Sequence, residues 1–184
     1  MRHPELRGEG LVLRRLRMSE ARELALAVQE SLPELRPYMP WAHEHYGLED
    51  ARAFIRFARE QEEKGAGLHY GIFRSRGDAY LGQLGIDLRP AIQSAELGYW
   101  VRSRAAGRGV ITRASSLLMA YAFEAFALRR MALTCDVKNR ASRRVAEKLG
   151  MRREGRIKAY LLDPAGRQRD HYLFGILKEE SLEA

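Results

Sequence analysis

The chain has 184 residues, of which 46% are hydrophobic and 30% charged, a composition typical of a folded domain and not of a disordered segment. No apolar run approaches the roughly 20 residues of a membrane-spanning helix, and the N-terminal residues lack the apolar stretch of a signal peptide. The single cysteine, Cys135, excludes an internal disulfide. We therefore expect one cytoplasmic domain over residues 1–184, without a membrane anchor.

The formal net charge is +8, carried by 27 arginines and only 5 lysines. Part of this charge belongs on solvated faces, but it also suits an anionic partner, either nucleic acid or a small molecule that carries phosphate. Arginine suits phosphate because its planar guanidinium can donate two hydrogen bonds to one group. Charge alone does not choose between these partners.

In the first third of the chain, hydrophobic patterning predicts one strand and two helices. Alternation over residues 11–17 is typical of a strand, and Ser19 is placed to cap a helix that runs to about Gln29. Prolines and aromatic residues over 32–45 indicate a loop or a broken helix. Apolar residues at helical spacing then predict a helix over 48–65, which ends at a glycine.

The central third combines strands with a glycine-rich loop. Residues 68–75 and 79–90 are expected to form two strands joined by a turn, and 94–102 a third strand. The loop 104–114 follows, and the apolar positions after it repeat at helical spacing. The sequence therefore predicts a strand, a loop and a helix in succession.

The last third predicts a strand over 131–137, a short helix over 139–149 that Gly150 ends, and two final strands over 151–162 and 169–177. Hairpins and helical crossovers both connect the strands, so the sheet should be mixed, with helices on its faces. The expected fold class is α+β, with a mixed α/β arrangement.

The loop RAAGRGVITRA, residues 104–114, joins a predicted strand to a predicted helix. No Gly-Lys-Ser/Thr follows its glycines, which excludes a Walker A loop, and Thr112 stands where a dinucleotide fingerprint needs its third small residue. The remaining pattern is Arg-x-x-Gly-x-Gly. Glycines let backbone N–H groups approach a phosphate, and a helix N-terminus favours an anion, although an ordinary tight turn would carry the same pattern.

About thirty residues later the chain carries a second motif, DVKNRASRRVAEKLGMRREG. Together the two motifs resemble the GNAT superfamily of acetyl-CoA-dependent N-acetyltransferases, whose pyrophosphate loop is (Arg/Gln)-x-x-Gly-x-(Gly/Ala). The second motif is similar to the Rim-type branch, which includes acetyltransferases of ribosomal-protein N-termini, and LVLRRL, PYMPW and AELGYWV look like the same branch. The residues that carry the resemblance are Arg104, Gly107, Gly109, Asn139, Ser142, Leu149, Gly150, Glu154 and Gly155.

The resemblance implies a GNAT-type fold, a mixed central sheet of about seven strands flanked by about four helices. The sheet would splay between the strands of AELGYWV and MALTCDV, pantetheine would lie in that gap, and the phosphates would lie on the amides of residues 104–109. Tyr99 and Trp100 alternate in facing, so at most one side chain points into the gap. The cofactor-binding residues implied are Tyr99, Trp100, Val101, Arg104, Ala106, Gly107, Arg108, Gly109, Val110, Thr112, Asn139 and Ser142.

Direct acetyl transfer to an amine needs a base for the amine and a proton source for the departing thiolate. We expect Glu96 as the general base, since it precedes the strand segment that should flank the thioester; a glutamate paired with one of the many arginines is the alternative. Ser142 is the expected proton donor or cofactor anchor, because the helix that follows lacks the tyrosine that many superfamily members use. Asn139 is placed to cap that helix through the amide of residue 142.

On the acceptor side, the resemblance implies a wall of Tyr38, Met39 and Trp41, and Tyr160 and His171 could reach the site from the last two strands. The expected substrate-binding residues are Tyr38, Trp41 and Tyr160. Simple packing of the first helices explains Tyr38 and Trp41 equally well. Some Rim-type relatives carry a carboxylate several residues after Glu-Gly, but RIKAYLL has none before Asp163. This departure leaves the base and the acceptor open.

Metal chemistry is not expected. The five histidines show no ligand spacing with cysteines or carboxylates, and His43 and His45, two apart in a loop, do not by themselves make a metal site. Cys135 lies in an apolar strand and is interpreted as a core residue, not a nucleophile.

The expected function is transfer of an acetyl group from acetyl-CoA to a primary amine, above all a protein N-terminal α-amine of the ribosomal type. A polyamine, an aminoglycoside-like molecule or an amino acid is the alternative acceptor, and the charge of +8 opposes a polycation. The same charge is compatible with docking on ribosomal RNA. An RNA-binding module without catalysis is a further alternative, although the arginines are scattered. Because relatives are often dimers, a homodimer is among the expected partners.

Overall fold

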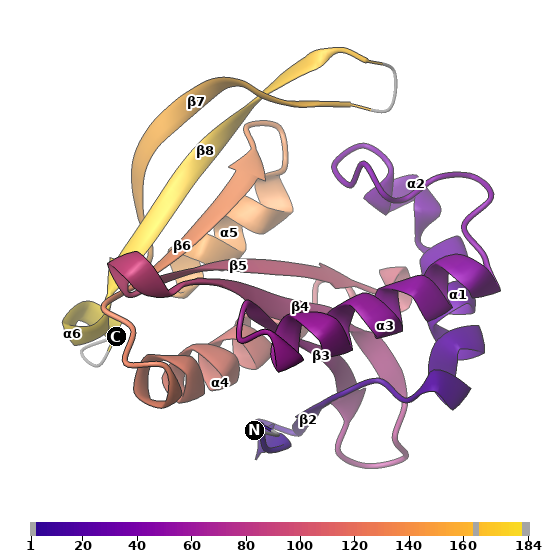
Figure 1. Cartoon of the computed structure of the whole chain (residues 1–184). Coiled ribbons are helices and arrows are strands. Elements are labelled where there is room, and N and C mark those ends of the chain that lie inside the picture. Colours follow the sequence, from indigo (N-terminus) through magenta and orange to yellow (C-terminus); the bar gives the residue numbers. More distant parts are fainter. Residues whose placement is uncertain (1–2, 164–165, 182–184) are drawn as a thin grey trace.

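The computed structural model describes residues 3–163 and 166–181. The strands of this part of the chain form one sheet in the order β1-β2-β3-β4-β5-β6-β8-β7, where β5 and β6 run parallel and the other neighbours are antiparallel (Figure 1). The strands are β1 (Leu6–Gly8), β2 (Leu11–Arg14), β3 (Gly67–Arg74), β4 (Tyr80–Arg89), β5 (Ser94–Val101), β6 (Arg130–Asp136), β7 (Arg152–Leu162) and β8 (Gln168–Leu177). The α-helices are α1 (Ala21–Glu30), α2 (Leu32–Leu35), α3 (Leu48–Glu63), α4 (Val110–Ala125), α5 (Arg140–Lys148) and α6 (Lys178–Ser181).

Helices cover both faces of this sheet (Figure 1). The helix α4 buries Ala114 and Leu118 against one face, where α5 also packs. On the opposite face, α1 and α3 bury Leu24 and Ile55 in a second core that includes Trp100 of β5. Full burial of one such aliphatic side chain contributes about 1.5–3 kcal/mol, so the two cores hold the sheet firmly between the helix layers.

The sheet opens between β5 and β6. Residues 94–96 pair with 130–132, whereas residues 97–101 of β5 pair on their other side with β4, and residues 133–136 of β6 pair with β8. This confirms the splay that the resemblance implies. At the far side of the sheet, β7 is the edge strand beyond β8, and its side chains are exposed on both faces apart from the half-buried Ile157.

The described residues contain eight strands and six α-helices, slightly more than the seven and four expected. The additional strand β1 has three residues, and α2 and α6 have four each, too short to give a periodic pattern. The prediction that Ser19 caps the first helix is wrong. Met18–Glu20 form a 3-10 turn and α1 begins at Ala21, because the Glu20 carboxylate accepts the N–H of Arg17 at 2.7 Å and starts the turn instead.

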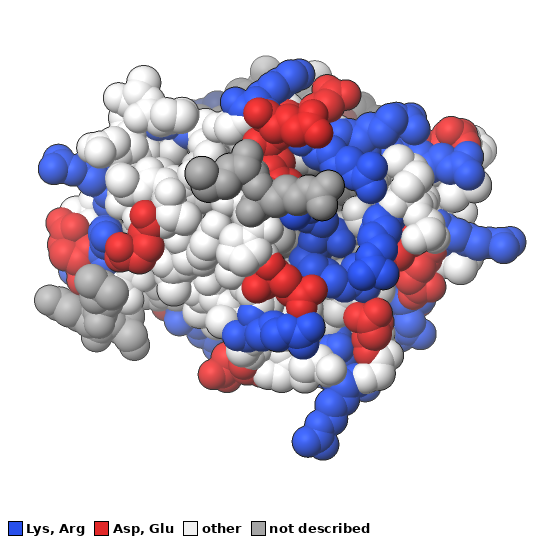
Figure 2. Space-filling model, turned by 60° about the horizontal axis from the view of Figure 1, so that its bottom comes forward, with Lys and Arg blue, Asp and Glu red and all other residues white. Residues whose placement is uncertain are grey.

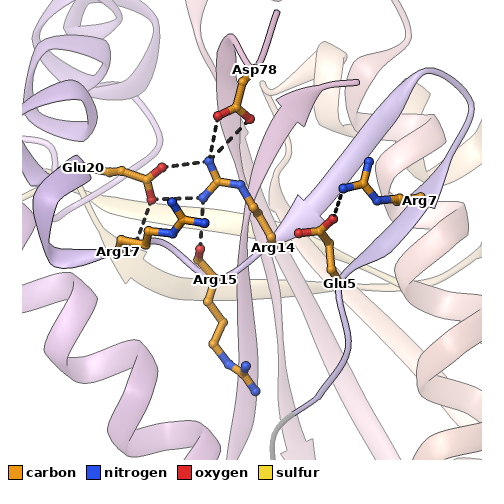
Figure 3. Close-up of polar contacts among 7 residues, drawn as sticks. All are labelled: Glu5, Arg7, Arg14, Arg15, Arg17, Glu20 and Asp78. Atoms are coloured by element: carbon orange, nitrogen blue, oxygen red, sulfur yellow. Dashed lines mark hydrogen bonds and ion pairs between the residues drawn. The ribbon is translucent and has the colours of Figure 1, made fainter. Parts of the chain in front are cut away.

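A buried arginine at the end of β2 joins three segments (Figure 3). The guanidinium of Arg14 contacts Glu20 at 2.7 Å and Asp78 of the β3–β4 turn at 3.2 Å, and its Cζ lies 3.5 Å from the ring centre of Phe73. Burial raises the pKa of Glu20, but hydrogen bonds from Arg14 and Arg17 outweigh burial and hold it below its ordinary value. The strand predicted over 11–17 therefore ends earlier, at Arg14, whose side chain turns toward the start of α1.

Candidate functional site

The loop between β5 and α4 is exposed and held open by glycine. Gly107 and Gly109 have φ angles of 73° and 70°, in the left-handed region, and a Cβ at Gly107 would meet no heavy atom within 4 Å. Backbone conformation, not crowding, therefore favours glycine here. Gly109 is the N-cap of α4 and makes no side-chain cap, so the first amide groups of this 16-residue helix are available to an anion.

An arginine that sequence analysis did not single out fixes the start of this loop. Arg102 is 6% exposed, and its guanidinium contacts Glu23 at 2.5 Å and Glu30 at 2.7 Å, both on α1. Ser103 donates its N–H to Ser31 Oγ at 3.0 Å. The signal that would have found this anchor is the seven-residue spacing of Glu23 and Glu30, which places both carboxylates on one face of a helix.

Most residues predicted to bind the cofactor from this loop lie together at the surface. Two differ. Val110 is the first residue of α4 and its side chain is buried in the core, so only its backbone N–H remains for a contact with the cofactor. Thr112 is half-buried in the first turn of α4, and its carbonyl accepts the hydroxyl of Ser116 at 3.1 Å. The surface residues are Arg104, Ala106, Gly107, Arg108 and Gly109, next to the half-buried Val101 at the end of β5.

A hydrogen bond crosses the gap between β5 and α5. The Tyr99 hydroxyl lies 2.8 Å from Ser142 Oγ. Asn139 caps α5 as predicted, because its Oδ1 accepts the N–H of Ser142 at 3.0 Å. Burial raises the pKa of Tyr99 well above its ordinary value, while the bond to Ser142 partly opposes this, so the phenol stays protonated and can donate.

Cys135 lies beside these hydroxyl groups. Its side chain is buried, as predicted for a core residue. Burial raises the pKa of its thiol, and a hydrogen bond with Ser142 partly lowers it. A raised pKa keeps the thiol protonated at neutral pH, and its burial fits the interpretation of Cys135 as a core residue.

Tyr99 and Trp100 point to opposite faces of β5, as strand alternation requires. The indole N–H of Trp100 donates to Gln83 Oε1 at 3.1 Å, and its ring centre lies 6.2 Å from that of Trp41. Of the two residues expected to bind the cofactor, only Tyr99 extends its side chain toward α5. The Trp100 side chain belongs to the core beneath α1 and α3.

Glu96, the predicted base, lies where β5 and β6 part. Its Oε2 accepts a hydrogen bond from Arg89 at 2.7 Å, and its Oε1 accepts the hydroxyl of Thr134 at 2.7 Å. The alternative considered for this residue, pairing with an arginine, is therefore present in the structure. Glu96 would have to weaken one of these bonds in order to take up a proton.

A pocket lies between the segment after α2 and the end of the β7–β8 hairpin, which face one another in Figure 1. Of the predicted substrate-binding residues, Tyr38 lines this pocket, and Tyr160 lies next to it with its ring centre 5.0 Å from that of His171. Trp41 is partly exposed and packs against Tyr46 instead. The lining residues are Pro37, Tyr38, Pro40, Asp136, Leu161, Leu162, Asp163, Arg169 and His171.

Two further expectations concern the described part of the chain. Within residues 3–163 and 166–181, no group of three or more His, Cys, Asp or Glu side chains is arranged to hold a metal ion. No helix in these ranges combines the length and apolarity needed to cross a membrane.

Comparisons of the sequence place the chain among acetyltransferases. A family model described as "Acetyltransferase (GNAT) domain" matches residues 10–152. The probable N-acetyltransferase YjcK of Bacillus subtilis is 30% identical over 178 residues, which are 95% of this chain and 98% of that protein. The ribosomal-protein-serine acetyltransferase of Escherichia coli is 25% identical over 151 residues, 82% of this chain and 83% of that protein.

Solved structures give the same result for the fold. RimJ of Mycobacterium smegmatis, solved with a CoA disulfide, is 29% identical with a TM-score of 0.86, over 96% of this chain and 87% of its own. RimL, a ribosomal-protein acetyltransferase solved with coenzyme A, has a TM-score of 0.88 over 95% of this chain and 98% of its own. At 22% identity, the likeness to RimL concerns the fold alone.

Proposed function

Because the chain belongs to the GNAT family of acetyl-CoA-dependent N-acetyltransferases, we propose that its acceptor is the N-terminal α-amine of a protein. Acetyl transfer from acetyl-CoA to an amine follows from the family match over residues 10–152. The observation that carries the finer assignment is the 29% identity to RimJ over 96% of this chain, which the E. coli ribosomal-protein-serine acetyltransferase supports at 25%.

The glycine loop is suited to the pyrophosphate of the cosubstrate. Residues 104–109 combine two left-handed glycines with the N-terminus of α4, and this cradle would hold phosphate oxygens by backbone N–H groups. The side of residues 97–101 that faces β6 is unpaired, and this strand edge would bond the amides of pantetheine. The anchor at Arg102 would keep the loop in place for both contacts.

The Tyr99–Ser142 pair is suited to the departing thiolate. Ser142 lies on the α5 side of the gap, and its hydroxyl is supported by a phenol that stays protonated. Ser142 would donate a proton to the sulfur and recover one from Tyr99, which supports the expected role of Ser142 as proton donor. Asn139 would fix the position of this hydroxyl through the cap of α5.

Basic charge supports a ribosomal acceptor over a free polycation. Figure 2 shows Lys and Arg side chains gathered over one half of the face that it presents, whereas the other half is largely uncharged. With a net charge of +8, a chain of this kind repels polyamines and is attracted to the phosphates of ribosomal RNA. The proposal thus includes a salt-sensitive contact with the ribosome in the cytoplasm.

The test is an acceptor panel with acetyl-CoA, read by mass spectrometry. The panel holds peptides with ribosomal-protein N-termini, the same peptides with a blocked α-amine, polyamines, aminoglycosides and free amino acids. We expect a gain of one acetyl group on the free α-amine of at least one peptide and none on its blocked counterpart. Acetylation of small amines alone would overturn the protein acceptor, and absence of ribosome binding at low salt would overturn the ribosome contact.

A further inference from the structure

His171 is a buried histidine on the acceptor-side face of the sheet. It lies on β8 directly opposite Asp136 of β6, and the next pair on the same face is Leu173 and Thr134. Thr134 in turn donates its hydroxyl to Glu96, where β5 and β6 part. The imidazole therefore lies on the same face of the sheet as Thr134 and Glu96, two residues before Leu173 on β8.

His171 lines the pocket, and one nitrogen of its imidazole has no hydrogen-bond partner among the described residues. His171 is 7% exposed and lines the pocket together with Tyr38 and Arg169. Within the part of the chain that the structure describes, its buried Nδ1 has no hydrogen-bond partner. A nitrogen buried without a partner costs about 1–3 kcal/mol, so its retention in a pocket points to a ligand that supplies the missing hydrogen bond.

Several charges surround this imidazole, from β8 itself and from β5 and β6. Burial lowers the pKa of His171 below its ordinary value; the charge of Asp136 raises it and that of Arg169 lowers it, with smaller increases from Glu96 and Asp170. Arg169 and Asp136 form an ion pair at 2.7 Å, and their charges shift the pKa of the ring in opposite directions. The neutral imidazole is thus the form present at pH 7, and a neutral imidazole can accept a proton. The other titratable groups at the pocket are Tyr38, Tyr160, Asp163 and Arg167.

Glu96, by comparison, is already engaged. Both of its carboxylate oxygens accept hydrogen bonds, one from the cation of Arg89 and one from Thr134. Proton uptake by Glu96 would break or weaken an ion pair, whereas proton uptake by His171 requires no such loss. The structure therefore favours the histidine over the glutamate for proton transfer from the amine.

We propose that His171 is the general base of this enzyme and accepts the proton that the acceptor amine loses; this rests on the proposed amine acetylation. The amine nitrogen forms a bond to the carbonyl carbon of the thioester, and the carbon–sulfur bond breaks with its electron pair going to sulfur. One amine proton passes to the imidazole and then to solvent, and the thiolate takes one proton from Ser142, which regains a proton from solvent through Tyr99. The products are the amide and free coenzyme A.

The experiment compares single-turnover rates of the wild type, His171→Gln and Glu96→Gln between pH 5.5 and 9.5, with the amine that the panel shows to be acetylated fastest. We expect the wild-type rate to fall at low pH as His171 becomes protonated. His171→Gln should lose about 10²- to 10⁴-fold in rate together with this pH-dependent limb, as removal of a general base does. Coenzyme A affinity, measured by calorimetry, should stay within about twofold, which a disturbed fold would not allow.

Two controls distinguish loss of the general base from a disturbance of the fold. His45→Gln changes an exposed histidine in the loop before α3 and should keep the wild-type rate. His171→Ala with added imidazole should recover part of the lost rate, with the buffer concentration dependence of a bimolecular step. A rate within threefold of wild type for His171→Gln, a low-pH limb that is unchanged in this variant once the separately measured titration of the acceptor amine is divided out, or a larger loss in Glu96→Gln would each overturn the proposal.

The outcome for the acceptor is read separately. If the wild type acetylates a small amine but no peptide, the protein acceptor fails, and the comparison of His171→Gln with wild type is made on that small amine. If the wild type binds coenzyme A but acetylates no amine, the base assignment fails together with the proposed acceptor.

Discussion

Replacing Arg102 by methionine should separate the anchor of the glycine loop from its phosphate contacts. Methionine keeps most of the apolar stem of the side chain but removes two charge-assisted hydrogen bonds, to Glu23 and Glu30. Each such bond contributes about 1.5–3 kcal/mol when buried. The carboxylates are 47% and 32% exposed, so water replaces part of the loss, and we expect a total of about 2 kcal/mol.

In a chain of this size, 1 kcal/mol corresponds to about 2–4 °C in melting temperature, so Arg102→Met should melt about 4–8 °C below wild type. If one backbone residue of the released loop has to be ordered again on binding, at about 1 kcal/mol, coenzyme A affinity should fall roughly three- to tenfold. Calorimetry of unfolding and of binding measures both quantities.

The matched control is Arg104→Met. Arg104 is largely exposed and its Nε lies 3.7 Å from Glu30, which makes it a surface ion pair with a contribution below about 1 kcal/mol. This control should therefore melt close to wild type. Two results would refute the anchoring role of Arg102: a melting temperature of Arg102→Met within 1 °C of wild type, or an equal fall in melting temperature in Arg104→Met.

Three further changes test the remaining parts of the site and the fold. Gly107→Val should weaken coenzyme A binding more than tenfold with a small change in melting temperature, because its Cβ meets no atom within 4 Å but its φ of 73° disfavours valine; unchanged affinity in a calorimetric titration would contradict the cradle. Tyr99→Phe should lower the single-turnover rate roughly tenfold at unchanged coenzyme A affinity, since Ser142 loses its 2.8 Å partner, whereas an unchanged rate would remove Tyr99 from the proton path. Because the folded-state pKa of Glu20 lies below its unfolded value of about 4.3, its stabilising effect is complete above that pH and is lost as pH falls through the folded pKa. The stability advantage of wild type over Glu20→Gln in urea unfolding should therefore shrink from pH 6 to pH 3, and an advantage independent of pH would argue against the ion pair with Arg14.

The sequence predicts those parts of the site that depend on local rules. The glycine loop between a strand and a helix and the cap of α5 by Asn139 are specified within a few neighbouring residues, and both were expected; the left-handed φ angles of Gly107 and Gly109 come from the structure. The splay of the sheet depends on longer range, and it came from the family resemblance and not from periodicity. Ser19 shows the limit of a local rule. The side chains of Ser19 and Glu20 can both accept a backbone N–H at the start of a helix, and in the structure the Glu20 carboxylate does so.

Contacts between distant segments could not be predicted in this way. Arg102 meets its carboxylates 72 and 79 residues away along the chain, and Glu96 meets Thr134 38 residues away. His171 gains its significance from a pocket that three separate segments close, and no pattern in a single sequence places those segments together. The partners of such side chains are identified only once the fold is known. Their residue types alone indicate which reactions or contacts they can make, but not with which partner.

The edge strand β7 bears on how copies of this protein behave toward one another. An unpaired strand edge of eleven residues is a template for main-chain pairing between molecules. Here five of those residues carry charge, four positive and one negative, and two register shifts interrupt the pairing with β8. The positively charged β7 edges of two copies therefore repel one another as long as salt does not screen their charges. Since the Debye length falls from about 10 Å at 0.1 M salt to about 3 Å at 1 M, light scattering should detect self-association first at high ionic strength.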